Sequence, residues 1–321
     1  MTTKMNKIHN MDCLEFMKTV PDNYFDLLVV DPPYFEVKGD FDFIWKTFDE
    51  FLEWIETLAI EFKRILSDKG SLYLYGHAKK IAYKQVIFDK YFNLENNLKW
   101  YKTDCRTRIG FDVFNSYPPV SEHILFYSNE VGMTGLEAIE EEFIKPRNPF
   151  SLYLRNEFKK AKVTSKEISK LFPSKTGGLT GCVSNWLNGN NVITGEQYQK
   201  VREYLECKFL DKPYEELRQE YEELRRPFQN KNRLDDVMMF AQEVHITGKY
   251  AHPTQKPPKL SKALISTSTR KDSKVYIPFI GSGVEAEQCI SLGLEWTGTE
   301  LEADYVAIAN KRLEQVQGSL F

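Results

Sequence analysis

The chain has 321 residues, of which 42% are hydrophobic and 28% are charged, and its formal net charge is −3. This composition is that of a globular protein with one large or two modest domains. The net charge gives no support for nucleic-acid binding over the whole surface, so any such surface must be local. No apolar run approaches the roughly 20 residues of a membrane span, and the polar N-terminal residues lack the apolar core of a signal peptide. The absence of such a run argues against a membrane partner. The five cysteines have no paired spacing, which argues against a disulfide framework or a zinc site and favours a reducing cytoplasm.

The first predicted elements alternate between strand and helix. Lys7–Asn10 reads as a short strand, and Asp12 can cap a helix that runs to about Lys18. Phe25–Val30 is a short apolar run, which is typical of a central parallel strand that is buried on both faces.

That buried strand is followed by Asp31, Pro32, Pro33 and Tyr34. The two prolines stop the strand because proline has no N–H group to donate. The result is a stiff turn that carries a carboxylate and an aromatic ring at the carboxyl end of a strand, where ligands bind in open α/β sheets. On position alone, a plain strand-ending turn is an equally good interpretation.

The alternation continues through the first half of the chain. Apolar residues recur at steps of three and four from Trp45 to Leu66, which indicates an amphipathic helix. Further elements are predicted as a strand over Ser71–Tyr75, a helix over Ile81–Tyr91, and strands over Asn97–Tyr101 and Glu122–Tyr127. Strands that alternate with helices predict a parallel, doubly wound sheet.

A basic segment interrupts this pattern. Lys145 to Lys175 contains nine basic residues and two acidic ones, a local charge of +7. Thr164–Glu167 matches a capping box that opens one short helix, and Thr180–Leu187 can form a second. The pair resembles a helix-turn-helix with an enlarged turn, which predicts a DNA-reading region. The alternative is a helical insertion with a solvated charged face. The candidate DNA-binding residues are Arg155, Lys159, Lys160, Lys175, Ser184 and Asn185.

The strand–helix pattern returns near the end of the chain. A strand over Lys274–Ile277 leads into the loop Pro278–Gly283, a helix over Val284–Leu292 and a strand that ends at Glu300. Glycines let the backbone approach a ligand closely, and an acid about 20 residues later can accept hydrogen bonds from ribose hydroxyls. A lysine of the kind that cradles phosphates is absent from the loop. An adenosine cofactor without phosphates fits, and S-adenosylmethionine is such a cofactor.

Three motifs in this order resemble the β class of DNA amino-methyltransferases: Asp31–Tyr34, His252–Pro257 and Pro278–Gly283. The resemblance implies a doubly wound, Rossmann-like methyltransferase fold of the α/β class with a circularly permuted motif order. It further implies a catalytic half over residues 1–144, an inserted helical and basic target-recognition region over residues 145–234, and a cofactor-binding half over residues 235–321. A helix near the C-terminus, from Glu302 to Val316, completes the predicted elements.

The resemblance also implies residue roles. Asp31, Pro32, Pro33 and Tyr34 would form the catalytic turn. The cofactor-binding residues would be Asp12 at the adenine, Glu300 at the ribose, and Asp31, Lys256, Phe279, Gly281, Ser282 and Gly283 elsewhere on the cofactor. This chain departs from the family at Ile277, where an acid is usual, and at Val284 and Glu285, where threonines are frequent. Those departures put the strength of cofactor binding in question.

The predicted activity is methylation of the N6 amino group of a flipped adenine in double-stranded DNA. The initial Asp31 favours adenine, because cytosine-N4 enzymes often have serine there. Cytosine-N4 methylation and a catalytically decayed DNA-binding regulator are the alternatives. The sequence leaves open a homodimer and a cognate restriction endonuclease as further partners.

Overall fold

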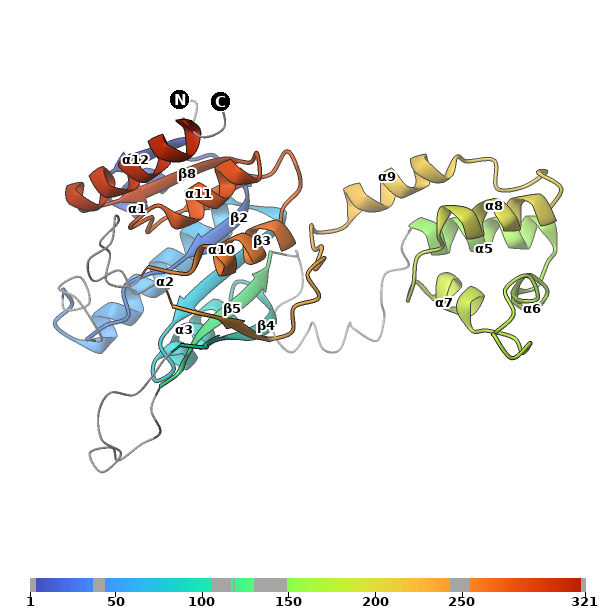
Figure 1. Ribbon diagram of the computed structural model, residues 1–321, viewed down its shortest axis with the longest axis horizontal. Helices are drawn as coiled ribbons and strands as arrows, with labels where there is room; N and C mark the ends of the chain where they lie inside the picture. The colour runs from blue at the N-terminus through green and yellow to red at the C-terminus, as the bar shows by residue number, and fades with distance from the viewer. Residues whose placement is uncertain are drawn as a thin grey trace. The chain divides into compact units, whose positions relative to one another are not determined.

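The computed structural model describes residues 4–36, 44–104, 117, 119–129, 149–242 and 255–318 (Figure 1). The chain forms two compact units, one made of Met1–Ala138 with Pro227–Phe321 and the other of Ile139–Arg226. The second unit therefore ends earlier than the expected residue 234. The reason is that Phe228 stacks on Phe126 at 5.8 Å between ring centroids, and the N–H of Gln229 donates to the carbonyl of Thr267 at 2.7 Å. Those contacts tie the residues after Arg226 to the first unit.

Within the described residues, the first unit is built on an eight-stranded sheet in the order β1-β8-β7-β2-β3-β5-β4-β6. The strands are β1 Lys7–Asn10, β2 Phe25–Val30, β3 Leu66–Gly76, β4 Asn93–Lys102, β5 Ser121–Ser128, β6 Val237–Phe240, β7 Lys274–Ile277 and β8 Glu295–Glu300. The bounds of β1, β2 and β7 are those predicted.

The sheet is mixed, whereas the sequence predicted a parallel one. β5 runs antiparallel to both of its neighbours, β3 and β4, and the other pairs are parallel. An antiparallel neighbour needs no crossover helix, so the sequence between β4 and β5 can return the chain directly. As a result, the first residues of β5 lie at the edge of the sheet where the parallel strands end.

Helices cover both faces of the sheet (Figure 1). One face packs against α1 Cys13–Met17, α2 Phe48–Ile65 and α3 Ile81–Phe88. The other packs against α10 Pro258–Thr267, α11 Val284–Ser291 and α12 Ala303–Gly318. Among the described helices, none is long and apolar enough to cross a membrane.

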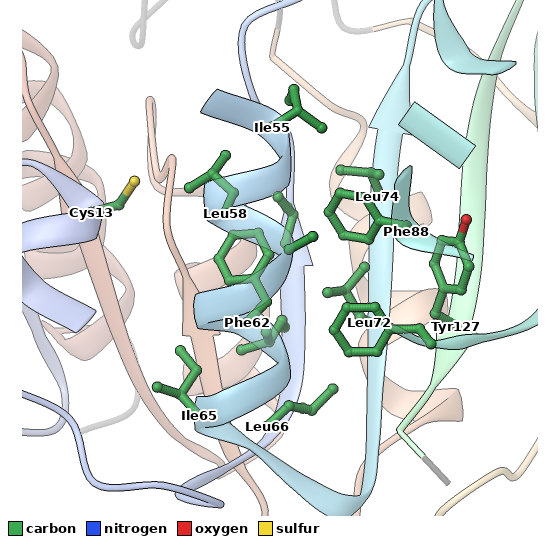
Figure 2. Packing of buried hydrophobic residues seen from close by; sticks show 14 of the residues in the cluster. Cys13, Ile55, Leu58, Phe62, Ile65, Leu66, Leu72, Leu74, Phe88 and Tyr127 are labelled. Atoms are coloured by element: carbon green, nitrogen blue, oxygen red, sulfur yellow. The ribbon is translucent and has the colours of Figure 1, made fainter. Parts of the chain in front are cut away.

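Helix α2 shows why the sequence pattern folds in this way. Its apolar side chains Ile55, Leu58 and Phe62 belong to one buried cluster that also contains Leu72 and Leu74 of β3 (Figure 2). Each of these side chains is almost completely buried, which contributes roughly 1.5–3 kcal/mol per residue. The helix begins after Thr47, whose hydroxyl caps it, rather than at the predicted Trp45.

The order of the strands creates a crevice. β2 and β7 are neighbours, but the chain leaves β2 toward α2 on one face and leaves β7 toward α11 on the other. Such a reversal of direction opens a crevice at the carboxyl ends of the two strands, which is where ligands bind in α/β sheets. The Asp31 turn follows β2 and the Pro278–Gly283 loop follows β7, so the fold brings both to this crevice.

The second unit contains α5 Pro149–Ala161, α6 Ser165–Ser169, α7 Cys182–Asn188, α8 Gly195–Tyr204 and α9 Tyr214–Leu224 around its own apolar core. The capping box at Thr164 is confirmed, with reciprocal hydrogen bonds to Glu167. α7 begins two residues later than predicted and ends at Gly189, whose left-handed φ of 78° terminates it. The sequence did not predict α5 or α8.

Candidate active site

The Asp31 turn is held in one conformation. The hydroxyl of Tyr34 donates to Oδ1 of Asp31 at 2.7 Å, and the buried Lys84 of α3 reaches the carbonyl of Pro33 at 3.4 Å. Phe35 and Glu36 follow with φ values of 59° and 50°, a left-handed conformation that costs on the order of 1–3 kcal/mol at each non-glycine residue. Such strain is concentrated at functional sites, where surrounding contacts maintain it.

Lys256 lies at the centre of a cluster of charges beside this turn. Its ammonium is 2.9 Å from Oδ2 of Asp31, 3.0 Å from Oε2 of Glu122 and 3.2 Å from the hydroxyl of Tyr34. Lys102 pairs with the other oxygen of Glu122 at 2.6 Å. The five residues of this cluster come from distant parts of the sequence. Asp31, Tyr34 and Lys256 were predicted site residues, whereas Lys102 and Glu122 were not.

The charges of this cluster stabilise one another. Burial alone would raise the pKa of Glu122, but the ammonium groups of Lys256 and Lys102 outweigh burial and lower it to about 2. Burial alone would lower the pKa of Lys256, but Asp31 and Glu122 outweigh it, and the pKa is raised. Burial, with the nearby carboxylates, raises the pKa of Tyr34 well above its usual value. At neutral pH the tyrosine is therefore a hydrogen-bond donor and the lysine is a cation.

The glycine loop after β7 is fixed by Glu300. The N–H of Gly281 donates to Oε2 of Glu300 at 2.9 Å, and the N–H of Glu302 donates to Oε1 at 3.0 Å. Burial raises the pKa of Glu300, although these two N–H groups oppose the shift. Gly283 begins α11 with a φ of 80°, and a Cβ there would lie 3.0 Å from that of Ala309. Glycine is therefore required for both conformation and space.

A buried arginine, which the sequence analysis missed, also positions this loop. Arg312 of α12 donates to the carbonyl and the hydroxyl of Ser282 at 3.1 and 3.2 Å, and to Oε1 of Gln255 at 3.0 Å. Its position between the core residues Ala309 and Leu313 places it on the buried face of the helix. An arginine at such a position is the signal that could have identified it, because a buried charge needs partners.

Asp12 and Glu300 stand at the ends of two neighbouring strands. β1 and β8 pair with Asn10 opposite Glu300, and the amide of Asn10 donates to the Glu300 carbonyl at 3.0 Å. Asp12 follows directly and caps α1 through its Oδ1, which accepts from the N–H of Leu14 at 2.8 Å. The two acids predicted to hold the adenosine therefore lie at the carboxyl ends of adjacent strands.

The lining of the crevice combines apolar side chains with two carboxyl groups and a paired lysine. Apolar side chains of Val29, Ile277 and Val284 lie beside the carboxyl groups of Asp31 and Glu285. Glu285 accepts from the hydroxyl of Ser261 at 2.9 Å, and burial raises its pKa. The lysine in the lining, Lys256, is already paired with carboxylates. Phe279, Gly281 and Ser282 of the predicted cofactor loop line the same crevice, whereas His252, Pro253 and Thr254 lie outside the described residues.

The predicted DNA-binding residues have different environments in the second unit. Lys159, Lys175 and Ser184 are exposed, and Asn185 is half-buried. Lys160 pairs with Glu157 at 2.7 Å and remains largely exposed. Arg155 instead contacts the end of α7, donating to the carbonyl of Leu187 at 2.6 Å and to Oδ1 of Asn188 at 2.9 Å. Trp186 is buried and Leu187 packs against the core.

Comparison with known proteins identifies a family of DNA-modifying enzymes and individual relatives. The family model described as DNA methylase matches residues 25–311. The type II methyltransferase M1.MboII of Moraxella bovis is 26% identical over 98% of both chains. The DNA adenine methyltransferase YhdJ of Escherichia coli is 21% identical over 94% of this chain and 81% of its own.

Two solved structures share the fold. The M1.HpyAVI complex with SAM has a TM-score of 0.51 and 16% identity, and the alignment covers 96% of this chain and 99% of the other. The PvuII DNA methyltransferase, which is cytosine-N4-specific, has a TM-score of 0.53 and 14% identity, with 98% and 90% covered.

Proposed function

Because this chain belongs to the DNA methylase family, we propose that it transfers a methyl group from S-adenosylmethionine to the N6 amino group of adenine in double-stranded DNA. The observation that carries this proposal is the meeting of the Asp31 turn and the Phe279–Gly283 loop at the ends of adjacent strands β2 and β7. An acceptor for the target amino group and a loop for the cofactor thus share one crevice.

The catalytic turn addresses a specific chemical problem. An exocyclic amino nitrogen is a poor nucleophile because its lone pair is delocalised into the ring. A carboxylate oxygen of Asp31 and the carbonyl oxygen of Pro32 can accept hydrogen bonds from the two N–H groups of this amino nitrogen. Those hydrogen bonds favour a pyramidal nitrogen with a localised lone pair. When bound, the cofactor supplies an electrophilic methyl group. No covalent bond between the enzyme and the base is required.

Tyr34 provides a surface for the base. Its ring is fixed by the hydrogen bond to Asp31 and by Lys84, whose ammonium is 4.9 Å from the ring centroid. A base must leave the duplex to reach this turn, which costs a few kcal/mol. Stacking of the flipped base on the Tyr34 ring stabilises the flipped state by on the order of 1–3 kcal/mol.

Binding of the cofactor is assigned to the opposite wall of the crevice. Glu300 and Asp12 would hold the adenosine, and the Phe279–Gly283 loop would hold the methionine part. The acidic group of Glu285 lines the crevice beside Ile277, where the family usually has an acid. Glu285 therefore offers a carboxyl group close to the position that lacks one.

The choice of adenine over cytosine rests on Asp31 as the first residue of the turn, and a relative named as a DNA adenine methyltransferase supports it. The test is to incubate the protein with unmethylated duplex DNA and S-adenosylmethionine, digest the DNA and separate the nucleosides. N6-methyladenine is expected. N4-methylcytosine alone would assign the other base, and DNA that is bound but never methylated would indicate a regulator.

DNA reading is assigned to the second unit, with α7 as the helix for the major groove. Lys159, Lys160 and Lys175 would contact phosphates, while Ser184 and Asn185 would face base edges. We assign Arg155 to holding the end of α7. The proposal also includes two partners, a second copy of this chain and a cognate restriction endonuclease. Sedimentation tests the dimer, and resistance of methylated DNA to an endonuclease with the same recognition sequence tests the second partner.

A further inference from the structure

Each carboxylate oxygen of Asp31 already has a hydrogen-bond donor. Oδ1 accepts from the hydroxyl of Tyr34 at 2.7 Å, and Oδ2 accepts from the ammonium of Lys256 at 2.9 Å. If Asp31 is the acceptor for the target amino group, as proposed above, that group must share the carboxylate with these donors or displace one of them. The Lys256 ammonium is itself an amine-type donor, so it competes directly with the amino group of the base.

Lys256 cannot simply withdraw into solvent. Only 4% of its side chain is exposed, and its ammonium lies 4.9 Å from the centroid of the Tyr75 ring. A buried charge that loses its partner destabilises a protein by several kcal/mol. Release of Asp31 is therefore feasible only where a second acceptor keeps the ammonium paired.

Glu122 is that second acceptor. It lies 3.0 Å from the Lys256 ammonium, and Lys102 holds its other oxygen at 2.6 Å. Its place follows from the direction of β5. Because this strand is antiparallel, its second residue lies at the carboxyl edge, opposite Trp100 of β4 and next to His123, which pairs with Gly76 of β3. A parallel strand would have placed the glutamate at the opposite edge.

We infer that Glu122 is a positioning residue for methyl transfer: it retains the Lys256 ammonium when the target amino group shares or takes over Oδ2 of Asp31. This inference rests on the proposed function, because it assumes that Asp31 receives the amino group. Without the Glu122 carboxylate, Lys256 has Asp31 as its anionic partner in the cluster, and the amino group must compete with a more firmly held ion pair.

The test is the single-turnover rate of methyl transfer to duplex DNA, measured in the full-length protein. Glu122→Gln should slow transfer by about tenfold to a hundredfold, which is the range for loss of one charge-assisted hydrogen bond. S-adenosylmethionine affinity should stay within about threefold. Glu56→Gln is the matched control, because Glu56 also accepts from a lysine and a tyrosine, Lys90 and Tyr91, both at 2.9 Å, but on the surface of α2.

A double-mutant cycle separates positioning from a general structural role. If Glu122 acts through Lys256, Glu122→Gln combined with Lys256→Met should transfer at the rate of Lys256→Met alone. If the double variant instead loses the product of the two single-variant rate losses, the inference is overturned. This double variant also carries the test if Glu122→Gln alone does not fold, because it removes both charges of the pair.

The failure of this inference can be told apart from failure of the proposed function. A Glu122→Gln protein that transfers methyl groups at the wild-type rate, while Asp31→Ala is inactive, would refute the role of Glu122 and leave the function intact. An Asp31→Ala protein that remains active would refute the assignment on which both depend.

Discussion

Replacement of Asp31 by alanine is the sharpest test of the catalytic assignment. The change removes one charge-assisted hydrogen bond to the target amino group, which contributes about 1.5–3 kcal/mol. It also leaves the Tyr34 hydroxyl and the Lys256 ammonium without their 2.7 and 2.9 Å partner, at a further cost of about 1–3 kcal/mol. Since each 1.4 kcal/mol is about tenfold in rate, transfer should fall at least about a hundredfold.

Single-turnover transfer of a labelled methyl group measures this rate, and calorimetry measures cofactor affinity, which should stay within about tenfold. Asp22→Ala is the control, because Asp22 is 71% exposed and its ion pair with Arg64 contributes little. Asp31→Asn keeps the shape of the side chain but should also be slow, because its amide faces hydrogen-bond donors. Near-normal turnover in Asp31→Ala would refute the reasoning.

Three further predictions address the cofactor and the DNA. Glu300→Ala and Asp12→Ala should each weaken S-adenosylmethionine binding and leave DNA binding largely intact; unchanged calorimetric affinity in both would place the cofactor elsewhere. Asn185→Ala should relax selection at one base pair by about 1–3 kcal/mol if it makes a bidentate contact, and a methylation profile with unaltered selectivity would contradict this. Replacing Lys159 and Lys160 together should weaken binding to all sequences alike and lower the salt slope by roughly one unit per lost phosphate contact, whereas an unchanged slope would remove them from the interface.

The parts of the fold that the sequence predicted are those set by local patterns. The bounds of β2 and β7 were predicted because each is a short apolar run followed by a residue that stops it, Pro32 in one case and Pro278 in the other. The capping box at Thr164 and the stripe of α2 are likewise local. β6 was missed because only one of its four residues is buried, so it lacks the apolar run that marks a central strand.

From the residue pattern alone, the site could be predicted only where it follows a strand, whereas Lys256 was expected from the family resemblance. Asp31, Glu300 and the glycine loop each stand at the end of a predicted strand, so the carboxyl edge brings them together. The contact of Lys256 with Glu122 could not be foreseen, because it depends on the direction of β5, which no local pattern encodes. Arg312 acts through a contact with Gln255 that spans 57 residues. Residues at strand ends could therefore be predicted from local patterns, whereas the residues that hold them through long-range contacts could not.

The pairing of β2 with β7 has a consequence for how the protein is made. Leu27 of β2 lies beside Val275 of β7, and Lys274 donates its N–H to Asp26 across a separation of 248 residues. At about 5–20 residues per second, a ribosome needs roughly 12–50 s to deliver β7 after β2 has emerged. During that interval one edge of the most apolar strand in the sheet has no neighbour, and exposed edges of this kind favour aggregation. The inserted unit, which has its own core, can fold meanwhile, so we expect the nascent chain to depend on chaperones until its last quarter is synthesised.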